Sequence, residues 1–216
     1  MLVFSAVVKL LVDSADPAEI GACVADKDTR GVTTSALSLA EAARRAGGSP
    51  HDLLRAICGV ANGPVCVAVA AGDHAAMLHE ARDWVAAGAG VVAMLPGSEA
   101  GIEVVRACAA ERIRTGVGAC ASPEQALAAA RAGAVTLAAP VGRVGGRDGY
   151  VDGYDVIRKL VALVRTYDLR TEVVADAIRI PIDVIDAALA GAHAATAPAA
   201  VVRQFDAESS RIANGG

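Results

Sequence analysis

Lysine is scarce in this sequence of 216 residues, because arginine supplies 17 of its 20 basic side chains. The three lysines are Lys9, Lys27 and Lys159. Any chemistry that depends on a lysine amine therefore has only three candidate positions. The net charge of −4 also lacks the basic excess that is typical of proteins that bind nucleic acids or anionic membranes, so we expect neither as a partner.

Long hydrophobic runs are missing too, although 54% of the residues are hydrophobic. The longest uncharged run, residues 56–72, has 17 residues, and another at residues 84–98 has 15; each includes three glycines and a proline. A membrane-spanning helix needs roughly 18 apolar residues. The apolar amino-terminal stretch is interrupted by Lys9 and Asp13 and does not resemble a signal peptide. These absences favour a cytoplasmic protein.

The cysteines lack the spacings of known metal and redox motifs. There is no CxxC pair, and an odd number of cysteines without a secretion signal indicates reduced thiols that serve mainly as small buried hydrophobes. No group of His, Asp or Glu has metal-ligand spacing either. We therefore expect neither a metal nor a cofactor. The five cysteines are Cys23, Cys58, Cys66, Cys108 and Cys120.

The sequence does contain a regular alternation of short apolar runs with helical patterns. Strands are predicted at 7–12, 31–34, 65–70, 90–94, 113–118, 134–138, 171–176 and 193–197. Helix signals lie between them, such as Ser122-Pro123 at one start and Gly133 at the corresponding end. This pattern predicts an α/β fold, a (β/α)8 TIM barrel in one domain over residues 1–206, with an open doubly wound sheet as the alternative. Residues 207–216 are predicted to be a flexible tail.

Polar side chains follow several of the predicted strands, where a (β/α)8 barrel builds its active site. Arg143 and Arg179 follow the sixth and seventh strands, and two such arginines can form a phosphate site. Asp13 and Asp176 follow the first and seventh strands and are candidates for an acid/base pair. Ordinary alternatives are salt bridges for the arginines, a helix cap for Asp13 and an ion pair with Arg179 for Asp176.

Six segments taken together resemble the transaldolase family, in particular its short members that include fructose-6-phosphate aldolase. They are LLVDSAD (10–16), GVTTS (31–35), VVAMLP (91–96), APVGR (139–143), ADAIR (175–179) and LAGAHAATAP (189–198). The likeness covers about residues 9 to 200 in the family's order and spacing. It implies a (β/α)8 barrel that acts on sugar phosphates, with Asp13 as the catalytic aspartate and with Arg143 and Arg179 as ligands of the substrate phosphate.

The sequence departs from the family where the family carries out its covalent chemistry. Transaldolases form a Schiff base through a lysine on the fourth strand, and that position is Met94 here. Four further polar positions of the family are occupied by Ser35, Ala68, Gly118 and Ala177. The lysines are expected elsewhere, two at the amino-terminal rim of the barrel and one on an outer helix. The resemblance therefore implies a divergent member that makes no enzyme imine.

These departures predict a pocket that keeps a phosphate site, has lost the amine and has gained an apolar recess above Met94. The predicted lining is Ser35, Ala68, Met94, Gly118, Cys120 and Ala177. If the substrate supplies the amine, such a pocket suits a Pictet-Spengler condensation of an aryl-ethylamine such as tryptophan with an aldose phosphate such as erythrose 4-phosphate, in natural-product biosynthesis.

Two other functions remain open at this point. One is a lysine-free aldolase, isomerase or dehydratase that acts on a sugar phosphate through Asp13 and Asp176. The other is a non-catalytic transaldolase paralogue that binds a sugar phosphate or a partner protein. In each case we expect a homo-oligomer, although the short glycine-ended tail puts a ring-like assembly in doubt.

Overall fold

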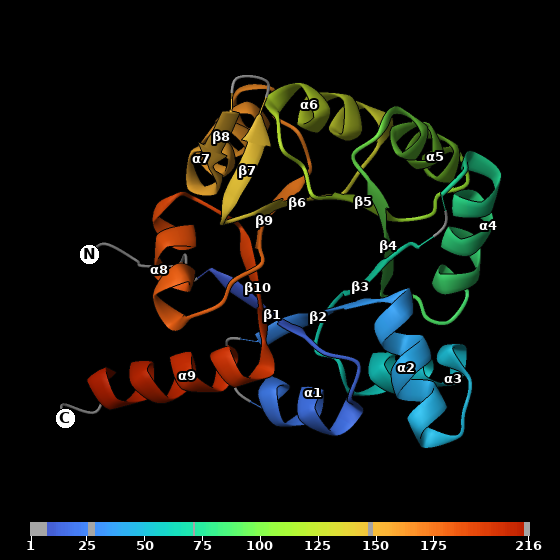
Figure 1. Cartoon of the computed structure of the whole chain (residues 1–216), viewed down its shortest axis with the longest axis vertical. Helices are drawn as coiled ribbons and strands as arrows, with labels where there is room; N and C mark the ends of the chain where they lie inside the picture. The colour runs from blue at the N-terminus through green and yellow to red at the C-terminus, as the bar shows by residue number, and fades with distance from the viewer. Residues whose placement is uncertain (1–7, 26–28, 71, 147–148, 214–216) are drawn as a thin grey trace.

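The computed structural model describes residues 8–25, 29–70, 72–146 and 149–213, and it excludes the side chains of 143–150 and 212–213. Its parallel strands close into a barrel in the order β1-β10-β9-β6-β5-β4-β3-β2 (Figure 1). The barrel strands are β1 (Lys9–Asp13), β2 (Thr29–Ser35), β3 (Val65–Ala68), β4 (Val91–Pro96), β5 (Thr115–Gly118), β6 (Thr136–Pro140), β9 (Glu172–Asp176) and β10 (Ala194–Pro198). The predicted (β/α)8 barrel is confirmed, and each predicted strand corresponds to one of these strands.

Helices surround the barrel on its outer face (Figure 1). They are α1 (Pro17–Val24), α2 (Ala36–Ala46), α3 (Pro50–Val60), α4 (His74–Val85), α5 (Glu99–Ala110), α6 (Pro123–Ala132), α7 (Gly153–Thr166), α8 (Pro181–Leu189) and α9 (Ala199–Ala213). Residues Ser122 and Asp16 accept N-terminal amide hydrogen bonds, each just before a proline, and Gly133 ends α6 at φ 109°. Local sequence signals therefore place these helix ends. No helix within the described residues has the length and apolar character needed to cross a membrane.

The strands divide their side chains between two hydrophobic layers, because successive side chains point to opposite faces. Leu10 and Val12 belong to the large core between the strands and the helices. Leu11 belongs to a small cluster inside the barrel, with Ala138, Val174 and Ala194. The same alternation places Asp13, two residues after Leu11, on the inner face at the carboxyl end of β1.

A two-stranded hairpin lies between β6 and α7, a segment in which the sequence predicted no strand. Its strands β7 (Arg143–Gly146) and β8 (Gly149–Asp152) pair antiparallel, with Arg143 opposite Asp152. The chain returns closely past the barrel after the hairpin, since a Cβ atom at Gly153 would lie 2.1 Å from the Pro140 carbonyl oxygen. Gly145, Gly146 and Gly149 thus belong to the hairpin, and Gly153 forms its exit.

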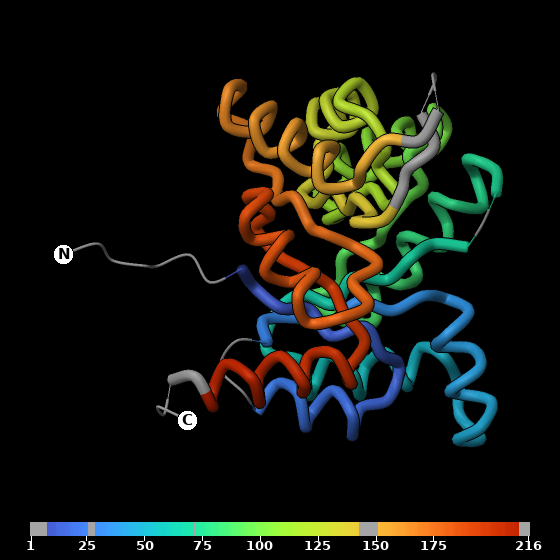
Figure 2. Tube along the Cα trace, turned by 60° about the vertical axis from the view of Figure 1, so that its left-hand side comes forward, coloured from blue at the N-terminus to red at the C-terminus, as the bar shows by residue number. Residues whose placement is uncertain are grey.

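The carboxyl-terminal segment differs from the prediction of a flexible tail from residue 207. Helix α9 continues as far as Ala213. It runs beside α1 (Figure 2), and Arg203 pairs with Glu19 at 3.8 Å. Gln204 donates a hydrogen bond to Glu208 at 2.9 Å across one helical turn. Contact with α1 and favourable helix-forming residues extend the helix beyond the point at which the apolar pattern ends.

Candidate active site

A pocket of about 260 Å³ opens at the carboxyl ends of the barrel strands. Register places the ends of neighbouring strands at one height, with Asp13 beside Thr33, Ala68 beside Met94, and Pro140 beside Asp176. The lining residues are Leu11, Asp13, Thr33, Thr34, Ser35, Ser38, Cys66, Ala68, Met94, Gly118, Thr136, Ala138, Val174, Asp176 and Thr196. The pocket therefore lies where a (β/α)8 barrel carries its chemistry.

Asp13 sits in a short chain of hydroxyl groups. The Thr33 hydroxyl donates to Asp13 Oδ1 at 3.3 Å, and the Thr33 and Thr196 hydroxyl oxygens are 2.5 Å apart. Removal from bulk water in the barrel mouth raises the pKa of Asp13, the Thr33 hydrogen bond lowers it, and the negative charge of Asp176 raises it further. The net result is a raised pKa, which suits a carboxyl group that must hold a proton.

Asp176 lies at the end of β9 and lines the same pocket. Its Oδ1 accepts the Ala177 N–H at 2.7 Å, and Ala177 adopts a left-handed φ of 61°. That turn leads the chain away from the barrel directly after the carboxylate. The structure thus brings together Asp13 and Asp176, the two carboxylates that the sequence proposed as a pair, and no ion pair between Asp176 and Arg179 occurs among the described residues.

The opposite side of the pocket is apolar. Met94 is half-buried, and a Cβ atom at Gly116 would lie 2.5 Å from its sulfur atom, so the Met94 side chain extends over β5. Ala68 and Gly118 flank it on β3 and at the end of β5. Among the described lining residues there is no lysine. This part of the pocket offers contact surface for an apolar ring and no amine.

The lysines occupy other parts of the molecule. Lys9 begins β1 at the amino-terminal end of the barrel and pairs with Glu172 at 2.5 Å. Lys159 is exposed on the outer helix α7. Both positions agree with the sequence prediction. Lys27 lies outside the described residues.

The two arginines predicted to bind phosphate are not among the residues that line the pocket. Arg143 begins β7, and its side chain lies outside the described part of the structure. Arg179 is exposed just after β9, and its backbone N–H donates to Asp183 at 3.0 Å. Its guanidinium makes no hydrogen bond or ion pair with another described side chain. The phosphate clamp therefore stays a prediction.

Two of the predicted lining residues lie outside the pocket. Cys120 is fully buried in the core between barrel and helices, and this burial raises the pKa of its thiol to about 11. Ala177 is exposed in the turn after β9. Cys120 lies beyond Gly118, the last residue of β5, and Ala119 turns the chain toward the outer core at φ 51°. Ala177 directly follows Asp176, the last inward residue of β9, and lies in the turn that leads away from the barrel. Ser35, Ala68, Met94 and Gly118 do line the pocket.

Five hydroxyl-bearing lining residues were not among the predicted site residues: Thr33, Thr34, Ser38, Thr136 and Thr196. Thr33 and Thr196 complete the hydroxyl chain to Asp13, and Thr136 lies deeper in the barrel. The side chains of Thr33 and Thr196, like that of Asp13, point into the barrel because strand side chains alternate between its two faces. This alternation was the signal available in the sequence. The adjacency of β1 to both β2 and β10, which brings the three together, depends on closure of the barrel.

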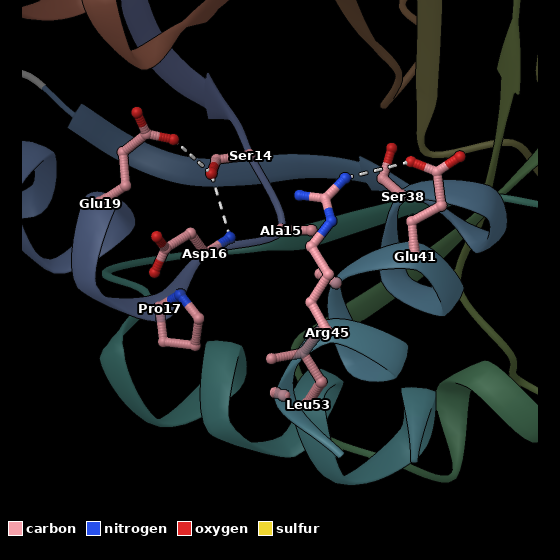
Figure 3. A pocket seen from close by; sticks show the side chains of 11 residues that line it. Ser14, Ala15, Asp16, Pro17, Glu19, Ser38, Glu41, Arg45 and Leu53 are labelled. Atoms are coloured by element: carbon pink, nitrogen blue, oxygen red, sulfur yellow. Dashed lines mark hydrogen bonds and ion pairs between the residues drawn. The ribbon is translucent and has the colours of Figure 1, made fainter. Parts of the chain in front are cut away.

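A second hollow, of about 670 Å³, lies beside the mouth between α1 and the α2–α3 pair (Figure 3). Ser38 lines both hollows. Ser14 donates a hydrogen bond to Glu19 at 2.7 Å, and Arg45 lies 3.6 Å from Glu41 along α2 (Figure 3). The wall combines carboxylates with one guanidinium. This hollow extends the mouth of the barrel sideways over helices α1 and α2.

Among the described residues, no group of three or more His, Cys, Asp or Glu side chains is placed to hold a metal ion.

Comparison with known proteins agrees with this architecture. The model of the Transaldolase/Fructose-6-phosphate aldolase family matches residues 10–214. A probable transaldolase of Sorangium cellulosum is 37% identical over 197 residues, 91% of this chain and 88% of the relative. Probable transaldolases of Anaeromyxobacter sp. (strain Fw109-5) and Rhodospirillum centenum are 36% and 38% identical, over 91% of this chain and 89% and 83% of theirs.

The chain is thus a (β/α)8-barrel protein with a site at the carboxyl ends of its strands. It belongs to the transaldolase/fructose-6-phosphate aldolase family. By this homology it is a sugar-phosphate-processing enzyme, as the sequence resemblance implied.

Proposed function

We propose that this enzyme joins an aldose phosphate to an amine-bearing aromatic partner by a Pictet-Spengler condensation, with the amine supplied by the substrate. The observation that carries the proposal is the composition of the mouth pocket, in which Asp13 and Asp176 face an apolar side formed around Met94. A carboxyl pair beside an apolar surface can move protons while an aromatic ring packs against the other side.

The reaction has two proton transfers that suit the two carboxyl groups. The substrate amine adds to the sugar aldehyde, and the resulting hydroxyl group leaves as water when protonated Asp13 donates its proton. A carbon of the aromatic ring then attacks the iminium carbon and forms the new C–C bond. The ring loses a proton to the carboxylate of Asp176, and proton exchange with solvent restores both groups. The raised pKa of Asp13 favours its role as the acid.

Space in the site supports two substrates in adjoining hollows. The mouth pocket, at about 260 Å³, is small for one drug-sized ligand and smaller than two substrates together need. The hollow between α1 and α2 adjoins it at Ser38 and adds about 670 Å³. We propose that the aldose and the reacting ring occupy the mouth, with the polar end of the amine partner reaching toward Glu41 and Arg45. Arg143 and Arg179 are the proposed ligands of the phosphate.

The direct test is incubation with erythrose 4-phosphate and tryptophan, followed by mass spectrometry. The expected product has the summed mass of the two substrates less one water, and Asp13→Asn should lower its formation by about 10²–10⁴-fold. Absence of any adduct across a panel of aryl-ethylamines would contradict the proposal. Turnover of the sugar phosphate without an amine would favour a lysine-free aldolase, isomerase or dehydratase. Thermal stabilisation by sugar phosphates without turnover would favour a non-catalytic paralogue.

A second test restores an amine at the position of the family's lysine. Met94→Lys places an ammonium group in the desolvated mouth, which lowers its pKa and makes it nucleophilic. We expect borohydride to trap a covalent adduct of this variant with a sugar phosphate, and we expect no such adduct with the wild type or with Met94→Leu. Product formation with tryptophan should fall, because the lysine competes for the aldehyde. Equal trapping in the wild type would show that another lysine forms the imine.

A further inference from the structure

The amino-terminal end of the barrel holds a second pocket on the axis, of about 570 Å³. Its cationic lining residues come from four places around the barrel: Lys9 from β1, Arg30 from β2, Arg114 from the residue before β5, and Arg170 from the segment before β9. Figure 1 shows β1 and β2 on the opposite side of the barrel from β5. The cations therefore surround one hollow and are not a stripe along a single helix.

Most of this positive charge has no counter-ion in the described structure. Lys9 pairs with Glu172, the carboxylate that lines this pocket. The guanidinium groups of Arg30, Arg114 and Arg170 make no ion pair or hydrogen bond with a described side chain. Four cations and one carboxylate leave a net charge of about +3 around the hollow, in a chain whose net charge is −4. A concave site lined by charges of one sign raises the local potential for anions, and here the four cationic residues are exposed around the hollow.

This pocket is separate from the catalytic mouth. Leu11, Cys66, Thr136 and Val174 line both pockets and lie between them. Leu11, Cys66 and Val174 are buried, and the buried environment raises the pKa of the Cys66 thiol to about 12. An anion at the amino-terminal end therefore contacts the arginines without reaching Asp13.

We propose that the amino-terminal pocket binds a phosphate-bearing anion with at least two negative charges, at a site distinct from the substrate site. Guanidinium groups present several N–H donors in a planar fork, which matches phosphate oxygens and forms charge-assisted hydrogen bonds. The pocket volume falls in the range of small-molecule sites, and Asn62 adds a polar side chain to its wall. This proposal stands independently of the reaction assigned to the mouth.

The test is calorimetric titration of the full chain with pyrophosphate at low ionic strength. We compare the wild type with the double variant Arg30→Ala/Arg170→Ala. The control is Arg44→Ala/Arg106→Ala, which removes the same charge from exposed arginines on α2 and α5. We expect at least tenfold weaker binding in the pocket variant, less than twofold weaker binding in the control, and a retained site in Arg179→Ala.

Three results would overturn the proposal: no pyrophosphate binding by the wild type, equal weakening in both double variants, or loss of binding in Arg179→Ala with retention in the pocket variant. The last result would place the anion at the mouth. Melting curves without ligand check that each variant is folded. If the double variant does not fold, the single change Arg170→Gln serves instead, with at least threefold weaker binding expected against an Arg44→Gln control.

Discussion

The two ends of the barrel differ in the charge that their strands direct toward the axis. At the carboxyl end, Asp13 and Asp176 line a small pocket together with threonine hydroxyls and Met94. At the amino-terminal end, one lysine, three arginines and a single carboxylate are the charged residues around a larger hollow. One layer of mostly apolar side chains, including Leu11 and Val174, separates the two. A single strand can serve both ends, since β1 begins with Lys9 and finishes with Asp13.

The carboxyl groups at the carboxyl end of the barrel are suited to proton transfer, whereas the cationic side chains at the amino-terminal end are suited to anion binding. Asp13 is exposed at the mouth of the barrel, and partial desolvation beside another carboxylate still raises its pKa, an arrangement that is costly for stability and useful for proton transfer. The ion pair of Lys9 and Glu172 is about half exposed, at 50% and 47% of the two side chains. The changes that follow separate these roles.

The largest effect is expected from Asp13→Asn. Asparagine keeps the size and the Thr33 contact but cannot donate a carboxylic proton. Loss of a general acid typically lowers the rate by 10²–10⁴-fold, and we expect condensation of erythrose 4-phosphate with tryptophan to fall by that amount, as measured by product formation. The matched change at the other end, Lys9→Gln, should leave the rate within twofold. A comparable loss in both variants would break the functional distinction between the ends.

Shortening a side chain in the layer between the two pockets should cost less stability than shortening one in the outer core. Leu10 is fully buried between strands and helices, and Leu11 borders both pockets inside the barrel. A Leu→Ala change costs about 2–5 kcal/mol, with the larger values where a closed cavity remains. We expect about 4 kcal/mol for Leu10→Ala and about 2 kcal/mol for Leu11→Ala in urea unfolding. Equal costs would mean that the barrel interior is packed as tightly as the outer core.

Asp13 should also make stability depend on pH in a defined direction. Because its folded pKa is raised above the usual 3.8, the folded state holds this proton more tightly than the unfolded state. The stabilisation is full below pH 3.8 and is lost as the pH rises through the folded pKa. Above that pH, Asp13→Asn should melt at a higher temperature than the wild type, and the difference should vanish in acid. A lower melting temperature for the variant at pH 7 would show that the charged carboxylate stabilises the fold.

The smallest effect is expected from Lys9→Ala. An exposed ion pair contributes about 0–1 kcal/mol, so the free energy of unfolding should fall by less than about 1 kcal/mol. Salt should reduce the difference, because it screens exposed charges. Measurement of urea unfolding at low and high ionic strength checks both points. A larger loss that is insensitive to salt would show that the lysine stem supports packing at the amino-terminal end.

The sequence predicted the barrel because its signals are local and repeated. Alternating strand residues, helix caps such as Ser122 and terminal glycines such as Gly133 act over a few positions. The predicted boundaries of helices and strands were less accurate where contacts with distant parts of the chain determine them. Helix α9 extends beyond Phe205 alongside α1, and the hairpin after β6 pairs strands that carry little apolar pattern.

The site was predictable in part for the same reason. Position at predicted strand ends located Asp13 and Asp176, and the resemblance to the family located Ser35, Ala68, Met94 and Gly118. Neither signal identified Thr196, whose contact with Thr33 crosses 163 positions and depends on closure between β1 and β10. Cys120 was assigned to the pocket although its strand ends at Gly118, and the chain beyond that point enters the outer core.

The sequence by itself determined the repeated βα units and the family, because these depend on residue type and local spacing. Only the tertiary structure decided which side chains share a cavity. Closure of the barrel brings strand ends from distant parts of the chain around one axis. It thereby places two carboxylates together at one end and four cations around a hollow at the other.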